Sequence, residues 1–233
     1  MTTTTDAAPA GHFRRGARPN RHQARRAATV LQLAEGLTGS ALDYGCGWGD
    51  LTFRLAPQFE RIEGWDVSAE RVAFAATEFA PIPFRQCAEA GIELADASVD
   101  VVFSTVVLHF VPSPEGYLTE CHRVLRPGGT LVVTIQNPDS MWMTARRWRR
   151  GTPAQPHWDR GVIKTWGGTL DTFRCWLEQQ GFAIERSDGF YDPPLDRLRT
   201  PGEVVVSALN AVGHLCAIDG RWSYVGFRCR RVG

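Results

Sequence analysis

A glycine-rich segment is the first part of the sequence whose residue types and spacing could bind a ligand. The segment is Asp43-Tyr44-Gly45-Cys46-Gly47-Trp48-Gly49-Asp50, and it joins a short apolar stretch to a helical pattern. Glycines allow positive φ and a close approach of the backbone to a ligand, and the first N–H groups of a helix are free to bind polar atoms. A merely tight strand-to-helix turn can have the same spacing, so a second feature is needed to indicate a site.

Asp66 supplies that second feature. It lies about 20 residues beyond the glycines at the end of the next expected strand, where a carboxylate can accept both ribose hydroxyls of an adenosine moiety. Sites for NAD and for S-adenosylmethionine both use this arrangement. The dinucleotide fingerprint would place its third glycine at position 50, where the chain has Asp50. An acid there is unfavourable beside a pyrophosphate but tolerable beside a zwitterionic sulfonium, and Asp43 also suits the positive groups of such a ligand.

The elements that must position these residues alternate between strand and helix. Strands are expected over 41–44, 61–67, 84–87, 99–107, 130–135, 183–186 and 223–230. Helices are expected over 21–35, 51–56 with Asp50 as its cap, from Ser68 as the cap of the next, 114–125, 170–180 and 204–216. This alternation predicts an α/β fold with a mostly parallel sheet and helices on both faces. Ligands of such sheets bind outside the carboxyl ends of the strands.

Composition fits one domain without a polyanionic partner. The chain has 233 residues, of which 43% are hydrophobic, and its formal net charge is +1, so we expect a sizeable core and no nucleic-acid partner. Lys164 is the only lysine. We interpret this as the codon bias of a high-GC genome, which makes arginine clusters weak functional signals.

The cysteines and the N-terminus indicate a reduced, cytoplasmic protein. The six cysteines are Cys46, Cys87, Cys121, Cys175, Cys216 and Cys229. None forms a CxxC pair or a zinc-finger spacing, so we expect free thiols and no metal site. Residues 1–20 have no apolar run and are expected to be a flexible tail rather than a signal peptide. The most apolar segment, 99–111, is shorter than the roughly 20 residues that span a bilayer.

Four ordered motifs resemble those of the class I S-adenosylmethionine-dependent methyltransferases. They are residues 41–49, residues 62–68, residues 98–102 followed by 107–111, and the phrase Arg123-Val124-Leu125-Arg126-Pro127-Gly128-Gly129. The resemblance covers roughly Ser40 to Pro138 and continues more weakly through 170–182 and 189–191, as in the small-molecule branch related to quinone biosynthesis. It implies a Rossmann-like, seven-stranded sheet and a single methyltransferase domain over 21–233, with a lid-like insertion around 138–168.

The resemblance also implies roles for individual residues. The cofactor-binding residues it implies are Asp43, Gly45, Cys46, Gly47 and Gly49 around the methionine part, Asp66 on the ribose, Val67 on the adenine face, Ala88 and Glu89 near the adenine edge, and Thr105. One position departs from the family, which often has Asp at the end of the third strand, where this chain has Cys87. Glu89 or a backbone carbonyl could take that role.

Methyl transfer from a sulfonium is an in-line displacement with a good leaving group. Positioning alone can supply on the order of 7–11 kcal/mol, so a general base is optional. His109, just past the fourth strand, is the candidate base. The alternative is that it shapes the pocket or bonds to the backbone. Gln136, Asn137 and Tyr191 are candidate substrate residues, although the first two are equally consistent with loop capping.

An insertion rich in tryptophan and arginine follows the fifth strand. Residues 141–150 read Met-Trp-Met-Thr-Ala-Arg-Arg-Trp-Arg-Arg, and aromatics among arginines can bind membrane surfaces or nucleic acid. Another interpretation is a lid in which Trp142, Trp148, Trp158 and Trp166 form an apolar wall over the substrate. A third is a solvated face with buried tryptophans. The aromatic content favours an aromatic or apolar acceptor.

The predicted function is methyl transfer to a hydroxyl or amine of a small molecule, in bacterial specialised metabolism. One alternative is an RNA or protein methyltransferase, but the charge is nearly neutral and Asn137-Pro138 follows the fifth strand, not the fourth as in the motif typical of those enzymes. Another alternative is a non-catalytic S-adenosylmethionine-binding partner protein. A nicotinamide oxidoreductase is more distant, because the third glycine is missing.

Overall fold

The computed structural model describes residues 21–88, 91–151, 153, 155, 157–158, 165–190 and 223–233, without the side chains of residues 21, 22, 141, 142, 145 and 146. Several expectations therefore lie outside the described residues: the tail over 1–20, the helix over 204–216, Glu89, Tyr191 and the side chain of Trp142.

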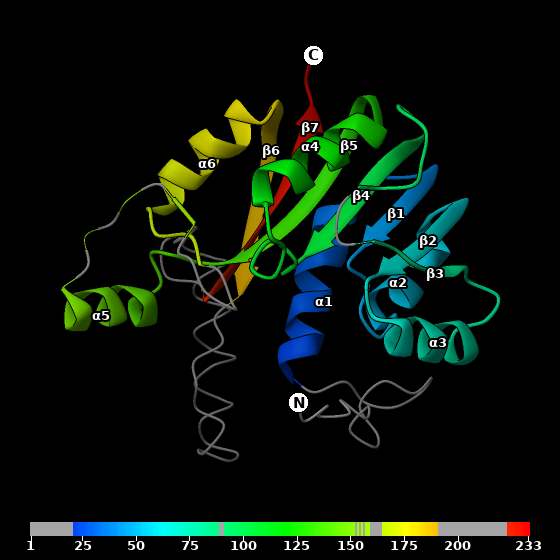
Figure 1. The fold of residues 1–233 in the computed structure, drawn as a ribbon, viewed down its shortest axis with the longest axis horizontal. Helices are drawn as coiled ribbons and strands as arrows, with labels where there is room; N and C mark the ends of the chain where they lie inside the picture. Colours follow the sequence, from blue (N-terminus) through cyan, green and yellow to red (C-terminus); the bar gives the residue numbers. More distant parts are fainter. Residues whose placement is uncertain are drawn as a thin grey trace.

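The described chain is built on one seven-stranded sheet in the order β3-β2-β1-β4-β5-β7-β6 (Figure 1). The strands are β1 (Ser40–Tyr44), β2 (Arg61–Asp66), β3 (Phe84–Gln86), β4 (Val99–Thr105), β5 (Leu125–Gln136), β6 (Phe182–Phe190) and β7 (Tyr224–Arg231). Only β7 runs antiparallel to its neighbours. The mostly parallel Rossmann-like sheet expected from the sequence is confirmed, and the carboxyl ends of β1, β2 and β4 meet at one edge.

Helices cover both faces of the sheet. They are α1 (Arg21–Ala34), α2 (Asp50–Leu55) with the short 3-10 turn η1 (Ala56–Gln58), α3 (Ala69–Glu78), α4 (Pro114–Val124), α5 (Met141–Arg150) and α6 (Leu170–Gln179). One core lies between the sheet and helices α4 and α6. A second core lies between the sheet and helices α1 and α2.

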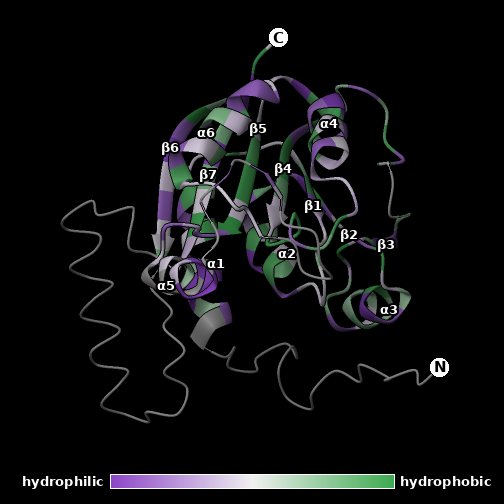
Figure 2. Ribbon diagram, turned by 60° about the vertical axis from the view of Figure 1, so that its left-hand side comes forward, coloured by the Kyte–Doolittle hydropathy of each residue, from purple (hydrophilic) through white to green (hydrophobic). Residues whose placement is uncertain are grey.

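Strand β4 shows how the sequence pattern produces these two cores. Its side chains alternate between the faces, so that Val102 joins the core under α4 while Val101 and Phe103 join the core under α1. Because both faces are covered, the strand reads as a continuous apolar run, and Figure 2 shows the hydrophobic colouring concentrated in the central strands. Full burial of each such side chain contributes about 1.5–3 kcal/mol.

Two local features differ from the sequence-based expectation, and a third agrees with it. Gly49, not Asp50, caps α2, because the cap residue has φ +83, a conformation that glycine adopts without penalty. Asp50 instead pairs with Arg54 at 3.0 Å. Helix α5 occupies a stretch for which no element was predicted. Ser68, as predicted, accepts a hydrogen bond from the Arg71 N–H and caps α3.

Arg123 on α4 fastens the segment that follows β3. Its guanidinium donates to the carbonyl oxygens of Leu94 (2.8 Å) and Ile92 (2.7 Å) and to the carboxylates of Glu120 and Asp96. The planar fork of arginine suits this set of acceptors. The side chain is only 30% exposed, so these bonds hold the segment against α4 with limited competition from water.

We expect Arg123→Gln to lower the free energy of unfolding by about 2 kcal/mol, because several charge-assisted bonds are lost together. Arg54→Gln, which removes one surface pair at i,i+4, should cost no more than about 0.5 kcal/mol. Urea denaturation of both variants checks the difference. Equal losses would show that Arg123 contributes no more than an ordinary surface ion pair.

Candidate active site

A cavity of about 510 Å³ opens at the carboxyl ends of β1, β2 and β4. Several parts of the chain line it: the first turns of α1, the glycine-rich loop after β1 with the start of α2, the residues after β2, and most of residues 105–112 after β4. Single residues after β3 and on α4 complete the lining. Its volume lies in the usual range for small-molecule sites. The position agrees with the rule that ligands of parallel sheets bind at the strands' carboxyl ends.

The glycine-rich loop lies close to the neighbouring strand ends. The N–H groups of Gly45 and Cys46 both donate to the carbonyl oxygen of Trp65, at 2.7 and 3.0 Å. At Gly45, a Cβ atom would lie 2.3 Å from Val107, so no larger residue fits. At Gly47, which has φ +57, a Cβ would meet nothing within 4 Å. The loop is therefore packed from behind and leaves open space in front of Gly47.

Tyr117 on α4 braces the same loop. Its hydroxyl donates to the carbonyl oxygen of Tyr44 at 2.8 Å, and the two rings stack with centroids 4.5 Å apart and an interplanar angle of 3°. Both tyrosines line the cavity. The apolar periodicity of the α4 segment gave no sign of this contact, because Tyr117 was not among the residues that define the pattern.

Asp66 connects the end of β2 to the loop. One carboxylate oxygen accepts from the N–H of Gly47 at 2.8 Å, and the other accepts from the N–H of Ser68 at 3.0 Å. The residue is 6% exposed and lines the cavity. Each carboxylate oxygen has a second lone pair, so Asp66 can accept ligand hydroxyls while it holds the loop.

Asp43 lies fully buried beneath the loop. Thr52 Oγ1 donates to Oδ2 at 2.6 Å, whereas Oδ1 has no hydrogen-bond partner among the described residues. Burial raises the pKa of the Asp43 carboxyl to about 6, although the bond from Thr52 and the charge of Arg26 lower it. An incompletely satisfied buried carboxylate of this kind favours a cationic ligand group nearby.

Arg26 is a site residue that sequence reasoning missed. It lines the cavity from α1, together with Gln23. Burial lowers the pKa of its guanidinium, and the charges of Asp43 and Asp50 raise it. Helix α1 therefore both covers the site and packs on the sheet through buried Val30 and other apolar residues. The arginine-rich composition gave no reason to single out this one.

The turn after β4 holds a strained residue. Val106 has φ +61, which is a genuine outlier for a β-branched residue and costs on the order of 1–3 kcal/mol. Its N–H donates to both the carbonyl oxygen and the hydroxyl of Thr134, each at 3.1 Å. Thr105, Val106 and Val107 all line the cavity, so the strained turn forms one of its walls.

The remaining cofactor predictions divide into three groups. The residues that line the cavity are Gly45, Cys46, Gly47, Asp66, Val67 and Thr105. Gly49 lies behind the loop, where a Cβ would meet Ala75 and Phe84 at 2.8–2.9 Å, and Ala88 is exposed and outside the lining. Cys87 lines the cavity, and burial raises the pKa of its thiol to about 11.

His109 lies beside the cavity without lining it. Its ring is 3% exposed, and its Nε2 accepts the backbone N–H of Gln136 at 3.0 Å. Nε2 therefore already accepts a hydrogen bond from the backbone, which leaves this nitrogen poorly placed to take a proton from a substrate. The ring also meets Trp158 edge-to-face at 5.9 Å. This geometry favours the alternative in which His109 bonds to the backbone and shapes the loop.

The two candidate acceptor residues after β5 also lie outside the cavity lining. Gln136 contacts His109 through its backbone. Asn137 is fully buried, and its Oδ1 accepts the N–H of Asp139 at 2.9 Å. A bond of this kind is expected if Asn137 caps the loop, which was the alternative to its binding the substrate.

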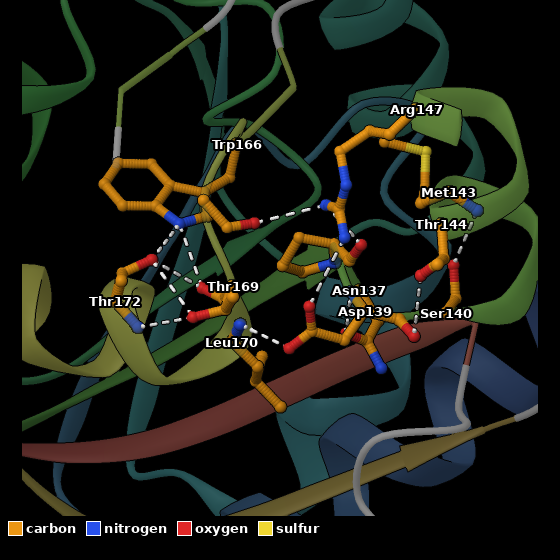
Figure 3. A network of polar contacts seen from close by, with 12 residues as sticks. Asn137, Asp139, Ser140, Met143, Thr144, Arg147, Trp166, Thr169, Leu170 and Thr172 are labelled. Carbon is orange, nitrogen blue, oxygen red and sulfur yellow. Dashed lines mark hydrogen bonds and ion pairs between the residues drawn. The ribbon is translucent and has the colours of Figure 1, made fainter. Parts of the chain in front are cut away.

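Three described residues of the insertion, Asp139, Trp158 and Trp166, contact α6. Asp139 accepts the N–H of Leu170 at 2.7 Å, and Arg147 donates to the carbonyl of Pro138 at 2.7 Å (Figure 3). Trp158 and Trp166 meet each other and Phe173 of α6 edge to face. Neither tryptophan lines the cavity, and Trp148 is 85% exposed. These three tryptophans are thus outside the lining of this cavity.

Comparisons with known proteins agree with this geometry. Residues 42–133 match a family described as a methyltransferase domain. The chain has the seven-stranded, mostly parallel sheet expected from its motifs. Residues 42–133 form a domain of the S-adenosylmethionine-dependent methyltransferase family.

Two curated relatives and one solved structure illustrate the similarity. The malonyl-[acyl-carrier protein] O-methyltransferase of Hahella chejuensis is 29% identical over 118 residues, which cover 49% of this chain and 42% of the relative. The ubiquinone biosynthesis O-methyltransferase of Rhizobium rhizogenes is 32% identical over 41% of this chain and 40% of the relative. The match thus spans less than half the length of these relatives.

The solved structure shows the fold over most of the chain. It is an S-adenosylmethionine-dependent methyltransferase from Mesorhizobium loti, with a TM-score of 0.62, 20% identity and coverage of 88% of this chain and 96% of that one.

The residues present fit S-adenosylmethionine, the cofactor of this family. The ligand carries an ammonium, a sulfonium, a carboxylate and a ribose. The structure offers an unsatisfied carboxylate oxygen on Asp43, a cation on Arg26, an acceptor on Asp66, and open space in front of Gly47. The carboxylate of Asp43 and the guanidinium of Arg26 thus match ligand groups of opposite charge.

We predict that Asp43→Asn raises the free energy of unfolding above pH 6. The pKa of Asp43 is about 6 in the folded protein against an ordinary 3.8, so the folded state binds this proton more tightly and loses stability as pH rises from about 4 to 6. The gain of the variant should reach at most about 3 kcal/mol and vanish below pH 4. Urea denaturation across this pH range measures it. A difference that does not change with pH would contradict the assignment.

We also predict that Val106→Gly leaves the free energy of unfolding within about 1 kcal/mol of the wild type. Relief of the positive-φ strain offsets the lost side-chain contacts and the entropy cost of glycine. Val107→Gly is the matched control. It removes the same side chain where φ is not positive and should cost about 2 kcal/mol. Equal losses in chemical denaturation would mean that Val106 stores no strain.

Proposed function

We propose that this protein transfers the methyl group of S-adenosylmethionine to a hydroxyl or amine of a small aromatic or apolar acceptor. The observation that carries the proposal is that one cavity joins the cofactor loop to an apolar wall. The wall consists of Val107, Phe110, Val111 and Pro112, and Phe110 is 61% exposed. An apolar acceptor held there would lie next to the cofactor loop.

The named relatives favour oxygen as the methylated atom. Both the Hahella chejuensis and the Rhizobium rhizogenes proteins are O-methyltransferases by name. We also propose that the acceptor belongs to bacterial specialised metabolism and that the protein is located in the cytoplasm. The described cysteines support a reducing compartment, because all five are free thiols. Among the described residues, no helix is long and apolar enough to cross a membrane.

The chain's own residues then act mainly by positioning. When bound, the cofactor supplies a methyl group on a positively charged sulfur that a nucleophile displaces in line. Asp66 would hold the ribose, Asp43 the ammonium and Arg26 the carboxylate. The turn over Thr105–Val107 would exclude water and fix the acceptor. The effective concentration gained in this way can supply on the order of 7–11 kcal/mol.

Proton removal does not need a side chain from the cavity wall. No histidine is among the described residues that line the cavity, and the lining thiols of Cys46 and Cys87 have raised pKa values because they are buried. His109 therefore acts, in our proposal, by holding the backbone of Gln136 rather than as a base. Asn137 would fix the same loop, and Tyr191 is a proposed substrate residue after β6.

The test is calorimetric titration of the purified chain with S-adenosylmethionine and S-adenosylhomocysteine, with NAD as the control. We expect micromolar binding of the first two and none of NAD. Labelled-methyl transfer to phenols, hydroxylated quinones and aromatic amines then identifies the acceptor class. Binding without transfer to any small molecule would favour the non-catalytic alternative, and binding of NAD alone would refute the proposal.

We predict that Asp66→Ala weakens S-adenosylhomocysteine binding by about 1.5–3 kcal/mol, the contribution of hydrogen bonds to a charged group. The variant also loses the bonds to Gly47 and Ser68, so its thermal midpoint must be measured to show that it is folded at the titration temperature. Arg54→Gln, with an intact loop, is the control and should bind as the wild type does. Unchanged affinity in folded Asp66→Ala would exclude Asp66 from the site.

A further inference from the structure

Helix α5 carries a concentration of charge that the methyl-transfer site does not use. Its ten residues include four arginines and no acidic residue, whereas the whole chain has a formal net charge of only +1. Ser140 caps its start, and Gly151 in the left-handed conformation ends it. The helix is thus a defined element with a strongly basic surface.

One side of α5 contacts the rest of the protein. Met143 is 5% exposed. Arg147 donates to the carbonyl oxygens of Pro138 and Gly168 and lies 3.6 Å from the Asp139 carboxylate (Figure 3). The charge of Arg147 is therefore used inside the protein, and these contacts fix which side of the helix faces outward.

The last turn of α5 exposes an indole and two cations, which point in successive directions around the helix. Trp148 is 85% exposed, more than any other large apolar residue among the described ones. Arg149 and Arg150 are also exposed, and neither forms an ion pair with another described residue. Leaving an indole in water is unfavourable. We call Trp148, Arg149 and Arg150 the α5 patch.

The α5 patch lies at the edge of the sheet where the cavity opens. Helix α5 follows the carboxyl end of β5, which runs parallel to β4, and Figure 1 shows it standing away from the sheet beyond that edge. Phe110, 61% exposed on the turn after β4, belongs to the same edge. The α5 patch and the cavity thus lie toward the same, carboxyl-end side of the parallel strands.

We propose that the α5 patch docks on the surface of an anionic lipid bilayer. Arginines are attracted to acidic headgroups, and an indole is most stable at the boundary between headgroups and acyl chains. Neither interaction requires a shaped groove in the partner, and the patch is a convex helix surface without one. Docking would hold the cavity edge near the membrane, where apolar acceptors concentrate. The proposal does not depend on the methyl-transfer reaction.

Sedimentation of the full chain with large unilamellar vesicles tests this proposal. We expect binding to phosphatidylcholine vesicles containing phosphatidylglycerol, much weaker binding to phosphatidylcholine alone, and release at high salt, where charges are screened within about 3 Å. Arg149→Gln/Arg150→Gln should bind roughly 25-fold more weakly, about fivefold for each arginine. Trp148→Ala should bind on the order of tenfold more weakly.

The matched control removes two charges from the opposite edge. Arg61 begins β2 and Arg126 lies near the start of β5, away from α5. Arg61→Gln/Arg126→Gln removes two positive charges, as the α5 double variant does. Because it leaves the α5 patch intact, it should bind vesicles as the wild type does. Equal binding to neutral vesicles, unchanged binding of the α5 variants, or an equal loss in the control would overturn the proposal. Binding to labelled RNA or to polyglutamate without binding to vesicles would also overturn it and assign the patch to that polyanion.

Discussion

The carboxylate of Asp66 is the interaction on which the organisation of the site depends. It accepts one backbone N–H from Gly47 and another from Ser68, so a single side chain joins the end of β2, the glycine-rich loop and the start of α3. Charge-assisted bonds of this kind are short and directional. These bonds hold the loop within the protein, so a ligand bound there, as proposed above, would not need to order it.

Three energetically unfavourable features lie around the same cavity. Asp43 has an unsatisfied buried oxygen, Arg26 is a half-buried cation, and Val106 holds a conformation that β-branched residues rarely adopt. The two cores, by contrast, consist of ordinary apolar packing. Functional sites are where a fold tolerates local conflict. The ligand's charges can relieve the first two conflicts, and the contact of Val106 with Thr134 maintains the third.

The sequence predicted the features that repeat along the chain or that depend on neighbouring residues. All the predicted strands are present, because their apolar periodicity and the glycine turns between them are local signals. Contacts between distant segments had no such signal. The bond from Gln136 to His109 and the approach of Arg26 to Asp43 arise only when the chain folds. Helix α5 was not predicted either; among its described residues, the caps Ser140 and Gly151 and the bonds of Arg147 help to hold it.

In the methyl transfer proposed above, the lining of the cavity would contribute alignment more than acid–base chemistry. A cationic methyl donor needs a nucleophile that is aligned and dry, and the residues after β4 supply an apolar wall rather than an acid or base. Selection among acceptors must then come from shape and from access to the cavity mouth. Because Phe110 lies at that mouth and α5 follows the same edge of the sheet, the surface around the opening, more than the cofactor loop, would decide which molecules reach the methyl group.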